Sequence, residues 1–451
     1  MKRSSKSVVG GRVSDRDVTA IEPLQRLFAL ETFGIKLGLE TISRLCEALG
    51  HPERAFTTLH VAGTNGKGSV TAMVHAGLVA AGVRAARYTS PHLVDLAERF
   101  VIGLEPIDQV SLEGAARDVL DCADALVASS TLAGPPTFFE ATTAIAFELF
   151  RRARVEVAVI EVGLGGRFDA TNIISPAATA ITSIGLDHQE QLGSTLESVA
   201  FEKAGIIKAG TPVVVGRLPA GAHAVIERVA AEHGASLVRA ADDVTVTVKM
   251  QAGRATVDIT TPKHDYGPLT LALRGEHQVD NALVAIRLVE MAHGRGLVLL
   301  PGAVARGLTD ATWPGRLEFL TLAGRRVLLD AAHNPDGAAA LARYLVRWHP
   351  ERPPLVFGAM RDKDVEGMLQ ALLPAVGEVV ATTPPTPRAA DARELAARVR
   401  ALARGRRVEV VDEPLSAVEL ALEHGQTICV AGSIYLVGAV RGALRARAIL
   451  S

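Results

Sequence analysis

The sequence predicts an α/β protein with two open, mostly parallel sheets. Short apolar runs, such as residues 155–162, 178–184 and 212–215, alternate with alanine-rich helical stretches such as residues 141–150. This alternation is typical of a doubly wound sheet with helices on both faces. A second strand–helix series begins near residues 325–330. We therefore expect a large doubly wound N-terminal domain and a smaller, Rossmann-like α/β C-terminal domain.

The chain opens with a segment that we do not expect to fold. Residues 1–20 carry five basic residues and several serines without an apolar run, which predicts a disordered leader rather than a signal peptide. An amphipathic pattern follows over residues 24–49. Residues 57–62 then indicate a buried strand that ends in a glycine-rich turn, and we expect a helix over residues 69–81.

Two features divide the rest of the chain. Residues 244–248, 256–259 and 269–273 alternate between apolar and polar side chains, which predicts a small β-rich appendage of antiparallel strands on the first domain. A turn-forming Thr-Trp-Pro-Gly sequence precedes the second strand–helix series. We place the domain boundary at this turn, so that residues 21–312 form the first domain and residues 313–451 form the second.

Composition limits the classes of function. The 451 residues are 48% hydrophobic and 22% charged, which is enough for large buried cores. The formal net charge of −1 gives no global field for nucleic acid or an anionic membrane. No apolar run approaches the ~20 residues that span a bilayer. Cys46, Cys122 and Cys429 lack the spacing of a metal site or a disulfide framework. We expect a cytoplasmic monomer that acts on small molecules.

The strongest local motif lies between the first predicted strand and helix. Its sequence is Gly63-Thr64-Asn65-Gly66-Lys67-Gly68-Ser69, in which backbone N–H groups and the helix dipole can hold a polyphosphate. Lys67 would reach the outer phosphates, and Ser69 would bind Mg²⁺. The motif is not an ordinary Walker A sequence, because Val61 stands at the first glycine position and Gly68 separates the lysine from the serine. A ligand-free turn is the alternative, but the lysine and serine in this context favour nucleotide binding.

Three isolated side chains are further candidates. Glu140 opens a helical stretch, His188 follows an apolar strand, and Lys203 is one of few lysines in an arginine-rich chain. An acid at a helix start is usually a dipole partner. A single histidine is usually structural, and a lysine usually lies on the surface. The residues by themselves leave these three roles open.

Longer motifs follow one another from about residue 24 to residue 440. They are TSPHL at 89–93, EVGLGGRFDATN at 161–172, EKAGIIK at 202–208, GEHQ at 275–278, WPGRLE at 313–318, DAAHNP at 330–335 and GSIYLVG at 432–438. In this order they resemble the dihydrofolate synthase/folylpolyglutamate synthase family of Mur-type ligases. One departure is Ala331, where some members have glycine, and it removes neither Asp330 nor His333.

The resemblance implies a role for each candidate. Mg²⁺ would be held by Ser69, Glu140 and His188. ATP would be contacted by residues 63–69 together with Asn281, Arg316 and Asp330. The pterin would lie against Ser90, Pro91 and His92. Glutamate would lie against Asp330, His333 and Ser433. The catalytic residues would be Lys67, Lys203 and His333, with Lys203 carbamylated to supply an anion at the metal site.

The activity that the resemblance implies is ATP-dependent addition of L-glutamate to dihydropteroate, to the glutamate tail of reduced folates, or to both, through an acyl phosphate. The first domain would bind ATP and the second would bind glutamate. A cell-wall Mur ligase is one alternative, but it would need an added N-terminal UDP-binding domain before the phosphate loop. A P-loop kinase, GTPase or nucleotide-binding protein is another, but it would leave the motifs of His333 and Ser433 unexplained.

Overall fold

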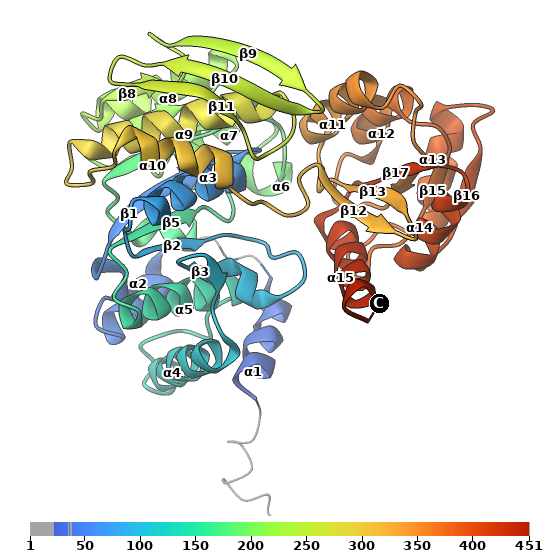
Figure 1. Cartoon of the computed structure of the whole chain (residues 1–451). Coiled ribbons are helices and arrows are strands. Elements are labelled where there is room, and N and C mark those ends of the chain that lie inside the picture. The colour runs from blue at the N-terminus through green and yellow to red at the C-terminus, as the bar shows by residue number, and fades with distance from the viewer. Residues whose placement is uncertain (1–21, 35, 37, 451) are drawn as a thin grey trace, which may run out of the picture.

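The computed structural model describes residues 22–34, 36 and 38–450, which form two bodies that lie side by side (Figure 1). The predicted disordered leader, residues 1–20, lies outside the described residues. Three sheets confirm the predicted α/β class, the β-rich appendage and the smaller second α/β unit. The domain boundary at residue 312 stays a prediction.

The first body is built on an eight-stranded sheet in the order β4-β3-β2-β5-β1-β6-β7-β8. Its strands are β1 (Thr57–Ala62), β2 (Ala85–Tyr88), β3 (Phe100–Ile102), β4 (Glu105–Pro106), β5 (Val157–Glu161), β6 (Ala178–Ile181), β7 (Val213–Val215) and β8 (Leu237–Arg239). The strands from β2 to β8 in this order pair in parallel. An antiparallel edge is added by β3 and β4.

Helices cover both faces of this sheet (Figure 1). The helices of the first body are α1 (Pro23–Ala29), α2 (Glu40–Ala48), α3 (Lys67–Ala80), α4 (Gln109–Ala128), α5 (Phe138–Arg152), α6 (Gln189–Leu192), α7 (Leu196–Ala204), α8 (Ala220–Glu232), α9 (His277–His293) and α10 (Pro301–Asp310). Short 3₁₀ turns are η2 (Leu30–Phe33), η3 (Pro52–Arg54), η4 (Leu96–Arg99) and η5 (Ala170–Ile173).

The central strands are apolar along their length because both of their faces are buried. Val159 of β5 belongs to the core beneath α3, α9 and α10, whereas Ala158 and Ile160 belong to the core beneath α4 and α5. Successive side chains of a strand point to opposite faces, so a strand covered on both sides lacks the usual polar alternation. This is why the continuous apolar runs in the sequence predicted these strands.

The appendage is a three-stranded antiparallel sheet in the order β11-β10-β9. Its strands are β9 (Thr245–Gln251), β10 (Arg254–Thr260) and β11 (Asp265–Thr270). One face joins the core of α9, and the hydroxyl of Tyr266 donates to the Glu290 carboxylate at 3.1 Å. The sheet lies over α9 and α10 at the edge of the first body (Figure 1).

The second body has a six-stranded sheet in the order β12-β13-β17-β14-β15-β16, with only β12 antiparallel. Its strands are β12 (Glu318–Leu322), β13 (Arg325–Leu329), β14 (Leu355–Phe357), β15 (Val379–Ala381), β16 (Val408–Val410) and β17 (Thr427–Ala431). Its helical elements are α11 (Pro335–Trp348), α12 (Val365–Leu372), η6 (Leu373–Ala375), α13 (Ala392–Leu402), α14 (Pro414–Glu423) and α15 (Ile434–Leu450).

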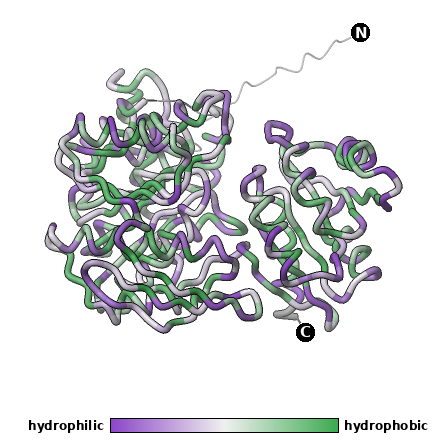
Figure 2. The backbone as a smooth tube through the Cα atoms, turned by 90° about the horizontal axis from the view of Figure 1, so that it is seen from above, coloured by the Kyte–Doolittle hydropathy of each residue, from purple (hydrophilic) through white to green (hydrophobic). Residues whose placement is uncertain are grey.

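Apolar segments run through the interior of each body in the view from above (Figure 2), and each body has its own core of buried apolar residues. Within the described part of the chain, every helix is too short or too polar to cross a membrane.

Candidate active site

A cavity of about 1130 Å³ is lined by residues of both bodies. In the first body, the cavity is lined by four segments, each of which follows the carboxyl end of one of the adjacent strands β2, β5, β1 and β6. In open α/β sheets, ligands bind outside the carboxyl ends of parallel strands. The fold therefore places the phosphate loop, residues 63–69, and the residue 89–93 segment around one space.

Three glycines of the phosphate loop are required by close neighbours. A Cβ at Gly63 would lie 2.0 Å from the Thr182 hydroxyl, and one at Gly66 would lie 2.4 Å from Asn281 Oδ1. Gly66 also has φ of +87°, which disfavours a side chain. A Cβ at Gly68 would lie 2.2 Å from the ring of Trp313. Gly68, the extra glycine that distinguishes this motif from a Walker A sequence, thus leaves space for the ring of Trp313, which lies in the segment after α10.

The loop is also held from the segment after β6. The Asn65 backbone N–H donates to Ser183 Oγ at 2.9 Å, and Thr182 Oγ1 donates to the Asn65 carbonyl at 2.6 Å. The Thr64 hydroxyl donates to the Gly185 carbonyl at 3.0 Å. These contacts fix the backbone of a loop whose N–H groups would otherwise be free to move, which is the preorganisation that anion binding requires.

Two lysines meet at the base of the loop. Lys67 Nζ donates to the carbonyls of Gly63 and Thr64 at 3.0 and 3.3 Å, and Lys203 Nζ donates to the same Gly63 carbonyl at 3.1 Å. Burial lowers the pKa of the Lys203 amine to about 7, and the charge of Lys67 acts in the same direction. A substantial fraction of Lys203 is therefore neutral at pH 7. Ser69 is buried in the first turn of α3 and lines the cavity.

The structure does not bring Glu140 to the cavity. Its carboxylate belongs to the capping box of α5, where it accepts hydrogen bonds from the Thr137 backbone N–H at 2.8 Å and the Thr137 hydroxyl at 2.9 Å. Both bonds are local and buried, and Glu140 is absent from the cavity wall. This geometry gives no support to the prediction that Glu140 holds Mg²⁺. A capping acid is the role that its position at a helix start suggests.

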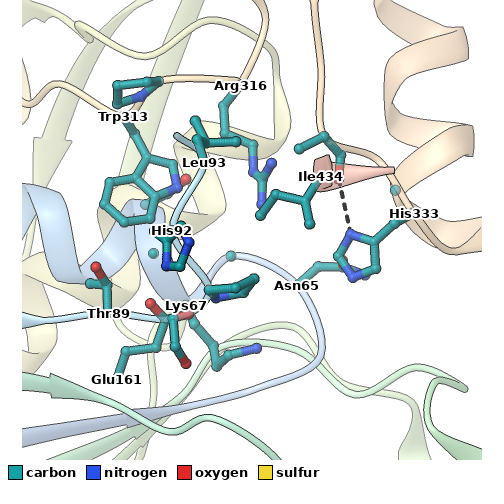
Figure 3. Close-up of a pocket in the computed structure, with 18 of the residues that line it drawn as sticks. Asn65, Lys67, Thr89, His92, Leu93, Glu161, Trp313, Arg316, His333 and Ile434 are labelled. Carbon is teal, nitrogen blue, oxygen red and sulfur yellow. Dashed lines mark hydrogen bonds between the residues drawn. The ribbon is translucent and has the colours of Figure 1, made fainter. Parts of the chain in front are cut away.

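The acid beside Lys67 is Glu161, which ends β5 (Figure 3). It is the register partner of Val61 on β1, two residues before the phosphate loop. Burial raises the pKa of the Glu161 carboxyl to about 7, against the opposing charges of Lys67 and Arg316. Its Oε2 is buried and accepts no hydrogen bond from a described residue. A carboxylate that faces the cavity with an unused oxygen is suited to bind a cation.

Asp187 and His188 form a second polar group after β6, and residues of the second body reach it. Lys363 Nζ lies 2.5 Å from Asp187 Oδ1 and 3.2 Å from His188 Nε2. His333 Nε2 lies 3.6 Å from Asp187 Oδ2. Although burial opposes it, the contact with His333 and the charge of Lys363 hold the pKa of the Asp187 carboxyl well below its usual range. Burial lowers the pKa of His188 to about 4, so its ring is neutral at pH 7.

The second body also contacts the phosphate loop directly. Asn334 caps α11 and exchanges amide hydrogen bonds with Asn65, at 3.2 Å in one direction and 3.1 Å in the other. The Nδ1 of the preceding His333 donates a hydrogen bond to the Ala331 carbonyl at 2.9 Å. The His333 ring points toward the first body (Figure 3). The start of α11 is thereby joined to the phosphate loop.

The other predicted contacts from the second body lie in the same cavity. Asp330 follows β13 and accepts backbone hydrogen bonds from Leu317 and Ala332 at 2.9 and 3.0 Å. Burial raises the pKa of the Asp330 carboxyl, while the charge of Arg316 opposes the shift. Ser433 follows β17 and is buried. Arg316, Asp330 and Ser433 all line the cavity, as does Asn281 of α9.

The predicted pterin segment forms the opposite side of the cavity. Ser90, Pro91 and His92 line it, and His92 Nδ1 accepts a hydrogen bond from Arg99 Nε at 3.0 Å. Burial and the charge of Arg99 lower the pKa of His92 to about 4. The neutral ring can therefore contact an uncharged heterocycle. Leu93, at the end of the segment, packs against Gly315 and Gly438 of the second body.

Sequence reasoning overlooked Glu161, Asp187 and Lys363. Glu161 was inside a motif quoted for its resemblance, and its place at the carboxyl end of a buried strand was a usable signal, since a strand-end acid beside a phosphate loop commonly serves Mg²⁺. Asp187 directly precedes His188 in the sequence. The described residues contain no group of three His, Cys, Asp or Glu side chains that could hold a metal, so a cation here would need oxygens of Ser69 or of a ligand.

Comparisons with known proteins agree with this geometry. Residues 127–289 match the model of the Mur ligase middle domain, and residues 315–434 match that of the Mur ligase glutamate ligase domain. Dihydrofolate synthase/folylpolyglutamate synthase of Bacillus subtilis is 34% identical over 92% of this chain and 96% of its own length. Folylpolyglutamate synthase of Lacticaseibacillus casei is 35% identical over 89% of this chain and 93% of its own length.

Solved structures show the same fold. Mycobacterium tuberculosis folylpolyglutamate synthase, solved with ADP and AMPPCP, superposes with a TM-score of 0.88 at 35% identity, over 94% of this chain and 98% of its own. A bifunctional folylpolyglutamate synthase/dihydrofolate synthase with Mn, AMPPNP and L-glutamate bound gives 0.81 at 31% identity, over 94% and 98%.

Proposed function

This chain belongs to the dihydrofolate synthase/folylpolyglutamate synthase family of ATP-dependent ligases, and from this premise we propose that it adds L-glutamate both to dihydropteroate and to the glutamate tail of reduced folates. The supporting observation is that the phosphate loop of the first body and the His333 segment of the second line one cavity. A kinase or a simple nucleotide-binding protein has no need of the second body, and the relatives named above are folate enzymes rather than cell-wall ligases.

The proposal assigns ATP to the phosphate loop and its surroundings. Loop N–H groups and Lys67 would hold the phosphates, and Asn281, Arg316 and Asp330 would contact the rest of the nucleotide. Residues 21–312 are then the ATP-binding domain, and residues 313–451 are the glutamate-binding domain. This division is supported by His333 and Ser433, which reach the cavity from the second body.

We assign a divalent cation, Mg²⁺, to Ser69, Glu161 and His188, with Glu161 replacing Glu140 of the sequence-based prediction. These side chains line the cavity, and the free oxygen of Glu161 and the neutral ring of His188 fit a cation. Lys363 already donates a hydrogen bond to His188 Nε2. Coordination of the cation by this nitrogen would therefore displace the Lys363 ammonium. When bound, Mg²⁺ would neutralise charge on the phosphates.

The chemistry divides into activation and amide formation. An oxygen of the acceptor carboxylate attacks the γ-phosphorus of ATP, the bond from this phosphorus to the β-phosphate oxygen breaks, and ADP leaves with the electron pair. The neutral amine of glutamate then attacks the acyl phosphate carbon, phosphate leaves, and the new amide loses a proton. Lys67 neutralises the moving phosphoryl group, and the second body excludes water that would hydrolyse the acyl phosphate. His333 and Ser433 would hold glutamate.

Lys203 is proposed to carry a carbamate, because burial leaves its amine partly neutral and only a neutral amine adds CO₂. We expect Lys203→Ala to lower kcat by about 10- to 100-fold, since the carbamate would support the metal site, and we expect acetate or formate to restore part of the loss. Activity of the variant with and without these anions is the measurement.

Lys208→Ala is the matched control for Lys203. It lies five residues along the chain, and its amine donates to the Asn172 carbonyl at 2.8 Å. We expect the control to keep its activity. An active enzyme in which ¹³C NMR detects no carbamate after incubation with labelled bicarbonate would contradict the assignment.

Bifunctionality is tested by the choice of acceptor. We expect glutamate-dependent ADP release with dihydropteroate and, separately, with tetrahydrofolate, because both present a carboxylate to the same activation step. The Bacillus subtilis relative is named for both activities, and the Lacticaseibacillus casei relative, of nearly equal identity, is named for one. Sequence identity therefore does not show whether this chain has both activities. A clear rate with tetrahydrofolate and none with saturating dihydropteroate would restrict the function to folylpolyglutamate synthesis.

We also propose that the protein is a cytoplasmic monomer. Its three cysteines are unpaired, which is the usual state in a reducing compartment. Sedimentation at micromolar concentration tests the oligomeric state.

A further inference from the structure

Arg87 is a cavity-lining cation whose side chain has no hydrogen-bonded or ion-paired partner among the described residues. It is the third residue of β2, and it is half-buried. Its side chain makes no hydrogen bond or ion pair with another described residue, and its Nε is buried without an acceptor. Its one specific contact is with Trp313, whose ring centroid lies 5.4 Å from the guanidinium carbon. That ring also covers Gly68 of the phosphate loop.

The other buried or half-buried cations of the cavity all have protein acceptors. Lys67, Lys203 and Arg316 donate to backbone carbonyls. Lys363 pairs with Asp187, and Arg441 pairs with Glu318. A guanidinium that is taken out of water without an acceptor is costly, and burial lowers the pKa of Arg87 to about 10 although the charge of Glu161 opposes the shift. Arg87 is the exception among these cations, and an anionic ligand would accept hydrogen bonds from its unpaired N–H groups.

The position of Arg87 in the sheet indicates which anion its side chain would bind. Arg87 is the register partner of Val159 on β5, and Glu161 lies two residues further along the same face. β5 separates β2 from β1, which leads into the phosphate loop. Arg87 therefore flanks Glu161 on the side away from the phosphate loop. The chain after Arg87 continues into the 89–93 segment that we assign to the acceptor.

We propose that Arg87 binds the carboxylate of the acceptor that is to be phosphorylated. This inference rests on the proposed function. The acceptor oxygen must approach the γ-phosphorus opposite the departing ADP, and Arg87 lies across β5 from the strand that leads into the phosphate loop. Two parallel N–H donors match a carboxylate. They would reduce the repulsion between that carboxylate and the triphosphate, and Trp313 would hold the guanidinium in place.

The test compares two ligands that differ only at the carboxylate. Binding of dihydropteroate and of its carboxamide, in which the carboxylate is replaced by an uncharged amide, is measured on the full chain with a non-hydrolysable ATP analogue and Mg²⁺. We expect the wild-type protein to prefer the acid by about 10- to 100-fold, the usual range for a charge-assisted pair. Arg87→Met should remove this preference while affinity for the ATP analogue changes less than about threefold.

Two further variants separate binding from folding. Arg87→Lys keeps the charge but loses the two-point contact, so an intermediate preference is expected. Arg84→Met is the matched control, because Arg84 precedes β2 and is exposed, and its side chain donates only to the Arg154 carbonyl, at 3.1 Å. It should behave as wild type.

An unchanged preference in Arg87→Met or Arg87→Lys, no preference in the wild-type protein, or a selective loss of nucleotide affinity would each overturn the proposal. Since binding alone is measured, these outcomes differ from failure of the proposed function, which would appear as wild-type protein that releases no ADP with glutamate and either acceptor.

Discussion

Replacing Lys67 with Ala is expected to lower kcat by about 10²- to 10³-fold, the range for removal of one preorganised group that stabilises transition-state charge. Lys67 opens α3, and the hydrogen bonds of its ammonium go to the carbonyls of Gly63 and Thr64. No core side chain depends on it, so the variant should fold. Glutamate-dependent ADP release and the thermal midpoint, measured on one preparation, provide the check.

The control for Lys67 is a lysine of the same protein outside the cavity. Lys249 is exposed on β9 of the appendage, and Lys249→Ala should keep full activity. ATP affinity gives a second readout, because the Lys67→Ala variant should bind ATP more weakly at an unchanged melting temperature. Near-normal turnover in a folded variant would show that this loop does not hold the transferred phosphate.

The sequence alone predicted the sheet strands well because their burial is a local signal. The runs at 178–184 and 212–215 became β6 and β7, each shortened at one end. The helix expected from residue 69 begins at Lys67 instead, because Gly66 takes the left-handed conformation immediately before it. The antiparallel strands of the appendage were found in the right order, with bounds that differ by up to four residues.

The site was less predictable because it is assembled from pairs that are distant in sequence. Lys363 and Asp187 are 176 residues apart, and Asn65 and Asn334 are 269 apart. No local pattern links such pairs. Glu140 and Glu161 illustrate the difficulty, since each is an acid at the end of a predicted element. Only the pairing of β5 with β1 places Glu161, and not Glu140, beside the phosphate loop.

Glu161→Gln is the second change with a large expected effect. Removing the charge should lower activity by about 10²- to 10³-fold and raise the Mg²⁺ concentration needed for half-maximal rate, because the side chain no longer offers an anionic oxygen. The protein should not lose stability. Burial raises the pKa of this carboxyl to about 7, so its ionised form opposes folding increasingly from about pH 4.5 upward, and fully above pH 7. The neutral amide therefore stabilises the fold relative to wild type more at pH 8 than at pH 5.

Glu140→Ala should show the opposite pattern, which makes the two acids a crossed test. Loss of the capping box costs about 1 kcal/mol, so the melting temperature should fall while kcat and the Mg²⁺ dependence stay close to wild type. Activity titrated against Mg²⁺, with thermal midpoints at pH 5 and pH 8, gives both readouts for both variants. If Glu140→Ala shifted the Mg²⁺ dependence and Glu161→Gln left it unchanged, the acid at the start of α5 would hold the cation after all. The position of Glu161 beside the phosphate loop would then need a different explanation.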